Sequence, residues 1–166
     1  NFDEAIKRMS CAGFINGYAD GSDSLIGTST KDNVRIESTG IVRLNDVKVT
    51  MDTTSVNTVV AINGGTVHMK DSSVSGGNHS VLADKDGKVY LNNVNIGKNK
   101  SSGIRANNAG SVVEATGVVI DGANTGLSLQ SGTITISDIT IRSTTGVGVN
   151  VAQSTSAANV TLNNLT

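Results

Sequence analysis

The segment Gly87-Lys-Val89-Tyr-Leu91-Asn-Asn93-Val94 contains the pattern that decides the fold. A glycine is followed by alternating apolar and polar residues, and the alternation ends at an Asn or Asp before one more apolar residue. Alternation with a period of two residues is typical of a β-strand with one buried face, not of an amphipathic helix. The segment therefore predicts a short strand that ends at a polar turn.

The same pattern recurs along the chain. Its copies begin at Gly40, Gly65, Gly87, Gly110, Gly132 and Ala158, at intervals of 25, 22, 23, 22 and 26 residues. A period of this length without a Leu-rich consensus indicates a solenoid whose coils bury their apolar side chains against one another. The copy at Gly110 is slipped, because Glu114 falls where an apolar residue is expected. A slip of one residue would point Val113 and Ala115 inward.

Two further apolar groups in each repeat predict the other strands of a coil. Nine residues past the start of each copy lies one apolar residue, in order Val49, Val74, Ile96, Val119 and Ile141. A further apolar strand precedes the next copy, at Val59–Ala61, Val81–Ala83, Ile104–Ala106, Leu127–Leu129 and Val147–Val149. Three short strands per coil predict an all-β fold, a right-handed parallel β-helix built as a three-sided solenoid of about five to six coils.

The composition agrees with such a narrow core. Hydrophobic residues make up 37% of the chain but aromatic residues only 2%, so burial must come from stacked small aliphatic side chains. The absence of Pro and the net charge of −1 argue against disorder, and the charge also argues against a nucleic-acid partner. Cys11 is the only cysteine, which excludes an internal disulfide. No apolar run approaches the ~20 residues of a membrane-spanning helix.

Residues 1–30 do not follow the repeat. Asp3–Met9 has helical spacing, so we expect residues 1–30 to form a capping segment whose short helix covers the open strand edges of the solenoid. Residues 31–166 are expected to form the β-helix. Because the sequence stops at Thr166 in the middle of a coil, we expect this chain to be a fragment of a longer solenoid.

A column of polar turn residues is the first candidate site. Alignment of the repeats places Asp46, Asp71, Asn93, Thr116, Asp138 and Asn164 at one position. Asp46 and Asp71 would lie in adjacent coils, and two nearby carboxyl groups are what a glycosidase requires. Asn at the same position instead favours a turn in which the side chain bonds to its own backbone. The turn is the preferred interpretation.

Other catalytic or metal-binding patterns are weak. His68 and His79 are the only candidate bases for neutral pH, and no serine has a nucleophile-elbow context. The two histidines and Cys11 do not have the spacing of metal ligands. We therefore predict no enzyme activity, no catalytic residue, no metal and no cofactor.

The outward side chains are a better candidate for function. Six of them are basic or aromatic and are expected to project outward from neighbouring columns: Arg43, Lys48, His68, Lys70, Lys88 and Tyr90. They predict a mildly basic patch on one side of a rigid rod. Such a patch could bind an acidic host surface, such as a glycosaminoglycan or a receptor ectodomain. The longer intervals also predict small loops at 52–58 and 153–157, which are further candidate binding positions.

Three segments carry a family resemblance. Asn63-Gly-Gly65-Thr-Val67-His-Met69, Val74-Ser-Gly-Gly77-Asn and Gly87–Val94 resemble the passenger domains of bacterial autotransporters, and the resemblance extends from Val34 to the end. The sequence of these repeats is also similar to that of host-directed passengers of Bartonella, some of which are proangiogenic ligands of an endothelial growth-factor receptor. The resemblance implies an extracellular or cell-surface protein of a Gram-negative bacterium. It also implies that the protein contacts a membrane only through a barrel encoded downstream.

These observations leave three hypotheses. The first is a non-enzymatic passenger fragment, an adhesin or receptor-binding virulence factor whose partner is a host cell-surface protein or glycan. The second is a carbohydrate-active β-helix, a polysaccharide hydrolase or lyase that uses Asp46 and Asp71. The third is a structural spacer that holds a functional tip away from the bacterial surface.

Overall fold

The computed structural model describes residues 16–17, 23–28, 30–152 and 156–166. This part of the chain is all-β and contains no helix. Its strands are β1 (Asn16–Gly17), β2 (Asp23–Gly27), β3 (Val34–Glu37), β4 (Ile41–Asn45), β5 (Val47–Met51), β6 (Val59–Ile62), β7 (Thr66–Gly76), β8 (His79–Asp84), β9 (Lys88–Ile96), β10 (Ser102–Asn107), β11 (Val112–Asp121), β12 (Thr125–Leu129), β13 (Gly132–Arg142), β14 (Val149–Val151) and β15 (Ala158–Leu165). The helix predicted at Asp3–Met9 lies outside the described residues.

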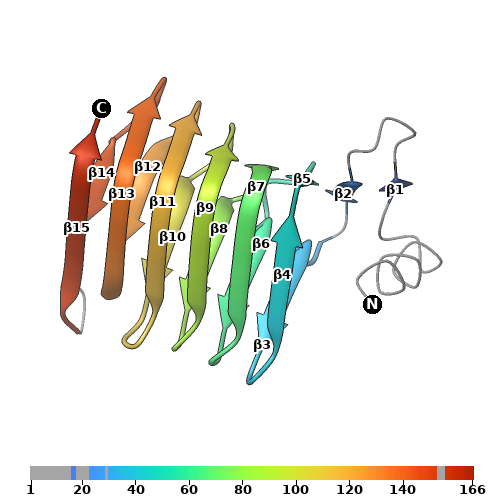
Figure 1. Ribbon diagram of the computed structural model, residues 1–166, viewed down its shortest axis with the longest axis horizontal. Coiled ribbons are helices and arrows are strands. Elements are labelled where there is room, and N and C mark those ends of the chain that lie inside the picture. The colour runs from blue at the N-terminus through green and yellow to red at the C-terminus, as the bar shows by residue number, and fades with distance from the viewer. Residues whose placement is uncertain (1–15, 18–22, 29, 153–155) are drawn as a thin grey trace.

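The strands stack as a parallel β-solenoid of about six turns, which confirms the predicted fold class. One sheet has nine strands, in the order β1-β2-β5-β7-β9-β11-β13-β15 with β4 beside β7. The other has six strands, in the order β14-β12-β10-β8-β6-β3. Figure 1 shows the coils side by side, from β3 and β4 to β14 and β15. Among the described residues, none belongs to a helix that could cross a bilayer.

A bend divides the larger sheet into two sides. At this bend each coil has one residue with a positive φ, between 49° and 66°: Asp46, Asp71, Asn93, Gly117, Asp138 and Asn164. We call these six residues the bend column. Gly, Asn and Asp adopt this left-handed conformation more readily than other residues. The strand segments before the bend, those after it and the smaller sheet form the three sides of each coil.

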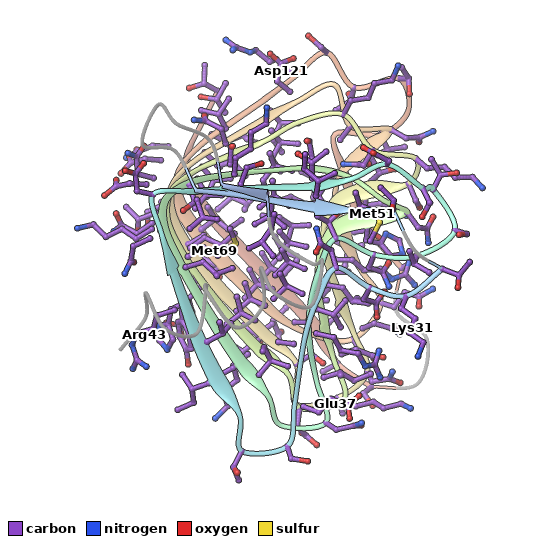
Figure 2. The ribbon with its side chains drawn as sticks, turned by 90° about the vertical axis from the view of Figure 1, so that its right-hand side faces the viewer. Lys31, Glu37, Arg43, Met51, Met69 and Asp121 are labelled. Atoms are coloured by element: carbon purple, nitrogen blue, oxygen red, sulfur yellow. The ribbon has the colours of Figure 1, made fainter. Side chains whose placement is uncertain are left out.

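The core is an aliphatic stack, as the composition predicts. Val67, Val89, Val113 and Ile134 lie in register in consecutive coils, and each is fully buried. Figure 2 shows Met69 among the interior side chains, whereas Arg43 lies on the outer surface. Because parallel strands are about 4.8 Å apart, each coil covers the apolar side chains of the next.

The coil that contains Glu114 has the predicted slip. Val113 and Ala115 are buried and Glu114 is exposed. Val112 pairs with Lys88, so Ser111, and not Gly110, lies opposite Gly87. The start of this coil is therefore one residue later than the repeat alignment predicts.

The same slip corrects two other alignments. Thr116 pairs with Asn92 and Ser137, so the bend residue of this coil is Gly117 and the assignment of Thr116 to the turn position is wrong. The inward residue after the bend is Ile120, which is fully buried, in place of Val119. The correction has one cause, because a single extra residue before the strand moves every later position of that coil.

Two further strands extend the stack at its ends. The last strand of the smaller sheet begins at Val149, which pairs with Leu127, whereas Val147 is 53% exposed. The predicted strand Val147–Val149 is therefore displaced by two residues. At the other end, β2 pairs in parallel with β5, so the stack includes residues before Lys31.

Candidate functional site

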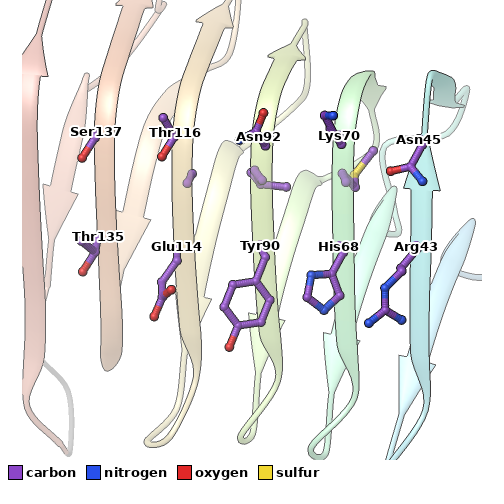
Figure 3. A pocket seen from close by; sticks show the side chains of 13 residues that line it. Arg43, Asn45, His68, Lys70, Tyr90, Asn92, Glu114, Thr116, Thr135 and Ser137 are labelled. Carbon is purple, nitrogen blue, oxygen red and sulfur yellow. The ribbon is translucent and has the colours of Figure 1, made fainter.

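An open groove lies on the outer face of the strand segments before the bend. Its volume is about 530 Å³, and its walls come from β4, β7, β9, β11 and β13. Figure 3 shows the polar side chains that line it. They form two columns that cross the strands: Arg43, His68, Tyr90, Glu114 and Thr135 in one, and Asn45, Lys70, Asn92, Thr116 and Ser137 in the other. We call these ten residues the groove columns.

The register of the sheet fixes the spacing of the groove columns. Residues that pair across parallel strands point to the same side, so each coil adds one side chain to each column at intervals of about 4.8 Å. His68 pairs with Arg43 on one side and with Tyr90 on the other. Glu114 pairs with Tyr90 and Thr135. The groove is therefore continuous across five consecutive strands.

His68 and Tyr90 stack in the groove. Their ring centroids are 4.8 Å apart and the angle between the rings is 16°. Stacked aromatic pairs at this distance stabilise one another, so each ring helps to fix the position of the other. The pair presents ring surface, an imidazole and a phenolic hydroxyl to the groove.

The charges of the groove are unevenly distributed. Arg43 and Lys70 come from the first two strands of the groove, and Glu114 comes from the fourth. Within the described part of the chain, Arg43 makes no ion pair. Lys70 lies 3.7 Å from the carboxylate of Asp71, but both side chains are about half exposed, so this pair is weak. A negative group would be attracted to the Arg43 end of the groove.

The surroundings of His68 keep its imidazole neutral at pH 7. Partial burial lowers the pKa of His68, and the positive charge of Arg43 lowers it further. A neutral imidazole has one nitrogen that donates a hydrogen bond and one that accepts. His68 can therefore bind both a hydroxyl donor and a hydroxyl acceptor.

The structure brings together four of the six predicted binding residues. Arg43, His68, Lys70 and Tyr90 line the groove. Lys88 precedes Tyr90 by two residues on β9 and is exposed on the same face, beside the groove. Lys48 follows the bend on β5, where it lines a different depression with Ser73 and Asn95. A bend at Asp46 separates Lys48 from the other five.

The prediction missed most of the polar partners. Glu114 marks the slipped copy in the sequence but is not predicted to be a binding residue, and the Asn, Thr and Ser residues of the groove columns are individually unremarkable. Their signal is the register: once Val113 is aligned with Val89, Glu114 follows Tyr90 in the column and Thr116 follows Asn92. The sequence contains this signal, but only after the slipped coil has been aligned correctly.

The bend column has a structural explanation of its own. The side-chain amide of Asn93 donates a 2.8 Å hydrogen bond to Asp71, and that of Asn164 donates a 2.8 Å hydrogen bond to Asp138. These contacts connect adjacent coils at residues whose backbone is left-handed. Asp46 and Asp71, the proposed carboxylate pair, both belong to this column.

His79 lies on the smaller sheet and is only 8% exposed. Its Nε2 is 3.3 Å from the amide nitrogen of Asn78, and its Nδ1 has no hydrogen-bond partner among the described residues. Burial and the nearby positive charge of Arg105 lower the pKa of His79 to about 4. His79 is a buried neutral side chain and does not line the groove.

The remaining candidate sites are a metal site and the two predicted loops. Among the described residues, no group of three or more His, Cys, Asp or Glu side chains could hold a metal ion. Asp52 and Thr54, from the first predicted loop, line a second depression with Lys98, Asn99 and Lys100. The second predicted loop includes residues 153–155, which lie outside the described part of the chain.

Comparison with known proteins adds nothing to this geometry. No family model matches the chain, and neither a curated protein nor a solved structure matches it. The function proposed for the groove therefore depends on its residues and on their arrangement.

Proposed function

We propose that this chain is part of a secreted or surface-exposed bacterial protein of the autotransporter-passenger type, which binds a host cell-surface protein or glycan through the groove and catalyses no reaction. The main support is one observation. Arg43, His68, Lys70 and Tyr90, which are up to 47 residues apart in the sequence, line one open groove. The resemblance of the repeats to passenger domains supports the extracellular location.

The β-solenoid suits a binding surface because its sheet is rigid. Each groove strand between β4 and β13 is hydrogen-bonded to a parallel neighbour in fixed register. Binding then requires only side-chain ordering and no rearrangement of the backbone, which lowers the entropic cost of association. The protein can act as an adhesin or a receptor ligand without a moving part.

A binding function explains the groove better than hydrolysis does. A glycosidase requires two carboxyl groups about 5–9 Å apart. In the described residues, Glu114 is the only carboxylate that lines the groove. The alternative pair, Asp46 and Asp71, belongs to the bend column, where the backbone conformation already accounts for an Asp or Asn.

Charge reversal in the groove tests this proposal. The double variant Arg43→Glu/Lys70→Glu should weaken binding to host cells at least about tenfold, because an attraction becomes a repulsion. The control is Lys48→Glu, an exposed lysine on another face, which should change binding less than about twofold. Circular dichroism would show whether each variant retains its β-structure.

Three results would contradict the proposal. Equal loss of binding in the control variant would show that total charge, not the groove, decides binding. Measured turnover of an acidic polysaccharide that is abolished by Asp46→Asn would instead support an enzyme. A protein that binds no host cell or matrix component would act as a spacer.

A further inference from the structure

We infer that the groove binds a linear acidic polysaccharide that lies along the solenoid axis, across the strands. This inference rests on the proposed binding function of the groove and assigns its ligand class. It is supported by three properties of the groove: its continuity along the axis, its hydrogen-bonding groups and the position of its charges.

The shape of the groove favours a long ligand. It is open and continuous over five strands, from Arg43 on β4 to Ser137 on β13. Sites for small molecules are usually concave pockets that bury most of the ligand surface. A chain of repeating units instead meets one member of each groove column at every step of about 4.8 Å.

The side chains of the groove suit hydroxyl-rich partners. Asn45 and Asn92 each offer an amide that donates and accepts, and the Thr and Ser residues of the groove columns offer hydroxyls that do the same. The neutral imidazole of His68 adds another donor and acceptor. The centre of a protein–protein interface is usually more apolar than this and is depleted in charged residues. Among the described residues that line the groove, the stacked pair is the only aromatic surface, and sugar rings can pack against it through their C–H groups.

The charges indicate where the acidic groups of the ligand bind. Arg43 and Lys70 lie at one end of the groove and Glu114 lies farther along, while Lys88 is exposed beside the groove on β9. A guanidinium can bind a carboxylate or a sulfate through two parallel hydrogen bonds. The acidic groups of the polysaccharide therefore lie over Arg43 and Lys70, and uncharged hydroxyls donate to Glu114.

The test uses three polysaccharides with the complete chain. Heparin carries both sulfates and carboxylates, polygalacturonate carries carboxylates alone and dextran is uncharged. Titration calorimetry should show binding of at least one acidic polymer and no binding of dextran. Binding of heparin but not of polygalacturonate would assign sulfate as the required acidic group, and binding of polygalacturonate would show that carboxylates are sufficient.

Three variants locate the binding. Arg43→Gln should weaken binding of the acidic polymer about tenfold, because it removes a charged hydrogen-bonding group. Tyr90→Ala should weaken it several-fold, because it removes the ring that stacks on His68. Lys48→Gln, which removes the same charge as Arg43→Gln from another face, should leave it unchanged. Equal weakening by Lys48→Gln would overturn the inference, because binding would then depend on total charge alone.

Host-cell binding separates this inference from the function on which it rests. Enzymatic removal of cell-surface glycosaminoglycans should abolish binding of the unmodified chain. If binding survives this treatment, is still lost in Arg43→Glu/Lys70→Glu, and no acidic polymer binds in solution, the ligand is a protein. The inference then fails, although the groove remains a binding site. If the chain binds neither polymer nor cells, both the inference and the proposed function fail.

Discussion

The bend column and the groove columns repeat on the same strands, but they obey different rules. Every member of the bend column has a φ between 49° and 66°, and every member is Asp, Asn or Gly. The groove column that begins at Arg43 continues with His, Tyr, Glu and Thr, and none of these residues has a positive φ. Backbone geometry selects the residues of the first column and places no such demand on the second.

This difference changes how a polar residue in a solenoid should be interpreted. A row of carboxylates attracts attention as a catalytic site, yet at the bend the left-handed backbone alone accounts for Asp46 and Asp71. A row of chemically different residues at positions without a backbone constraint is not accounted for by backbone conformation. In the groove columns we propose that the explanation is a ligand.

The two histidines give the strongest test of the difference between a buried position and the groove. The pKa of His79 is about 4 in the folded chain and near 6.5 in the unfolded chain, so the unfolded state binds the proton more tightly. Stability is fully present above pH 6.5 and is lost as the pH falls from 6.5 to about 4. Urea unfolding should show a loss of about 3 kcal/mol from this group.

The His79→Gln variant separates this effect from the carboxylates, which also titrate in acid. Its free energy of unfolding should depend less on pH between 6.5 and 4 than that of the unmodified chain. His68→Gln is the matched control and should retain most of the original slope, because His68 lies on the open face. Identical slopes for His79→Gln and the unmodified chain would show that His79 is not responsible.

The second test concerns the bend column. Asp138 has a φ of 55° and accepts a hydrogen bond from Asn164. Asp138→Val places a β-branched residue in the left-handed region and removes the acceptor, so it should lower the free energy of unfolding by about 2 kcal/mol. Asp138→Asn tolerates the same backbone and should cost less than about 0.5 kcal/mol. A valine variant as stable as the asparagine variant would mean that the bend does not select its residues.

The sequence predicts the coils well because the repeat is local. Alternation of apolar residues shows which side chains face the core, and Glu114 alone is enough to reveal the slip that buries Val113 and Ala115. The position of the bend in the slipped coil is harder to predict. Thr116 and Gly117 are adjacent, and the bend is assigned to Gly117 only when the slip is continued past Ala115 to the end of the coil, as the pairing with the neighbouring coils shows.

The groove is predicted less completely for a related reason. Arg43, His68 and Tyr90 follow from one template position, so the sequence aligns them correctly. Lys48 also occupies an outward-facing position of the alternating pattern. It follows the bend, however, so its side chain lies on another side of the coil. A sequence pattern states whether a residue faces out. It does not state toward which side.

The third test concerns the groove and has a smaller effect. His68 is surrounded by Arg43 on β4, Lys70 on its own strand, Tyr90 on β9 and, beyond Tyr90, Glu114 on β11. An acidic ligand favours the protonated imidazole, so binding of an acidic polysaccharide should strengthen a few-fold as the pH falls from 7.4 to 5.5. His68→Gln should remove this increase, and it should also weaken binding at pH 7.4, because it removes the ring that stacks on Tyr90. An increase that persists in the variant would assign the pH dependence to another group.

The smallest effect is expected at Gly117, the one member of the bend column without a side chain. Its φ is 66°, and a Cβ added there would meet Asn93 at 3.7 Å, which is ordinary van der Waals contact. Gly117→Asn should therefore fit the bend and stabilise the chain by about 0.5 kcal/mol, because it restricts the unfolded chain more than the folded one. In Gly117→Val the added Cβ has the same space, but a β-branched residue is strongly disfavoured at a positive φ. This variant should therefore destabilise the chain by about 1 kcal/mol or more. If the urea midpoints of the two variants move in opposite directions, backbone conformation and not available space selects the residue at the bend. If both variants are more stable than the unmodified chain, or both are less stable, this conclusion is contradicted.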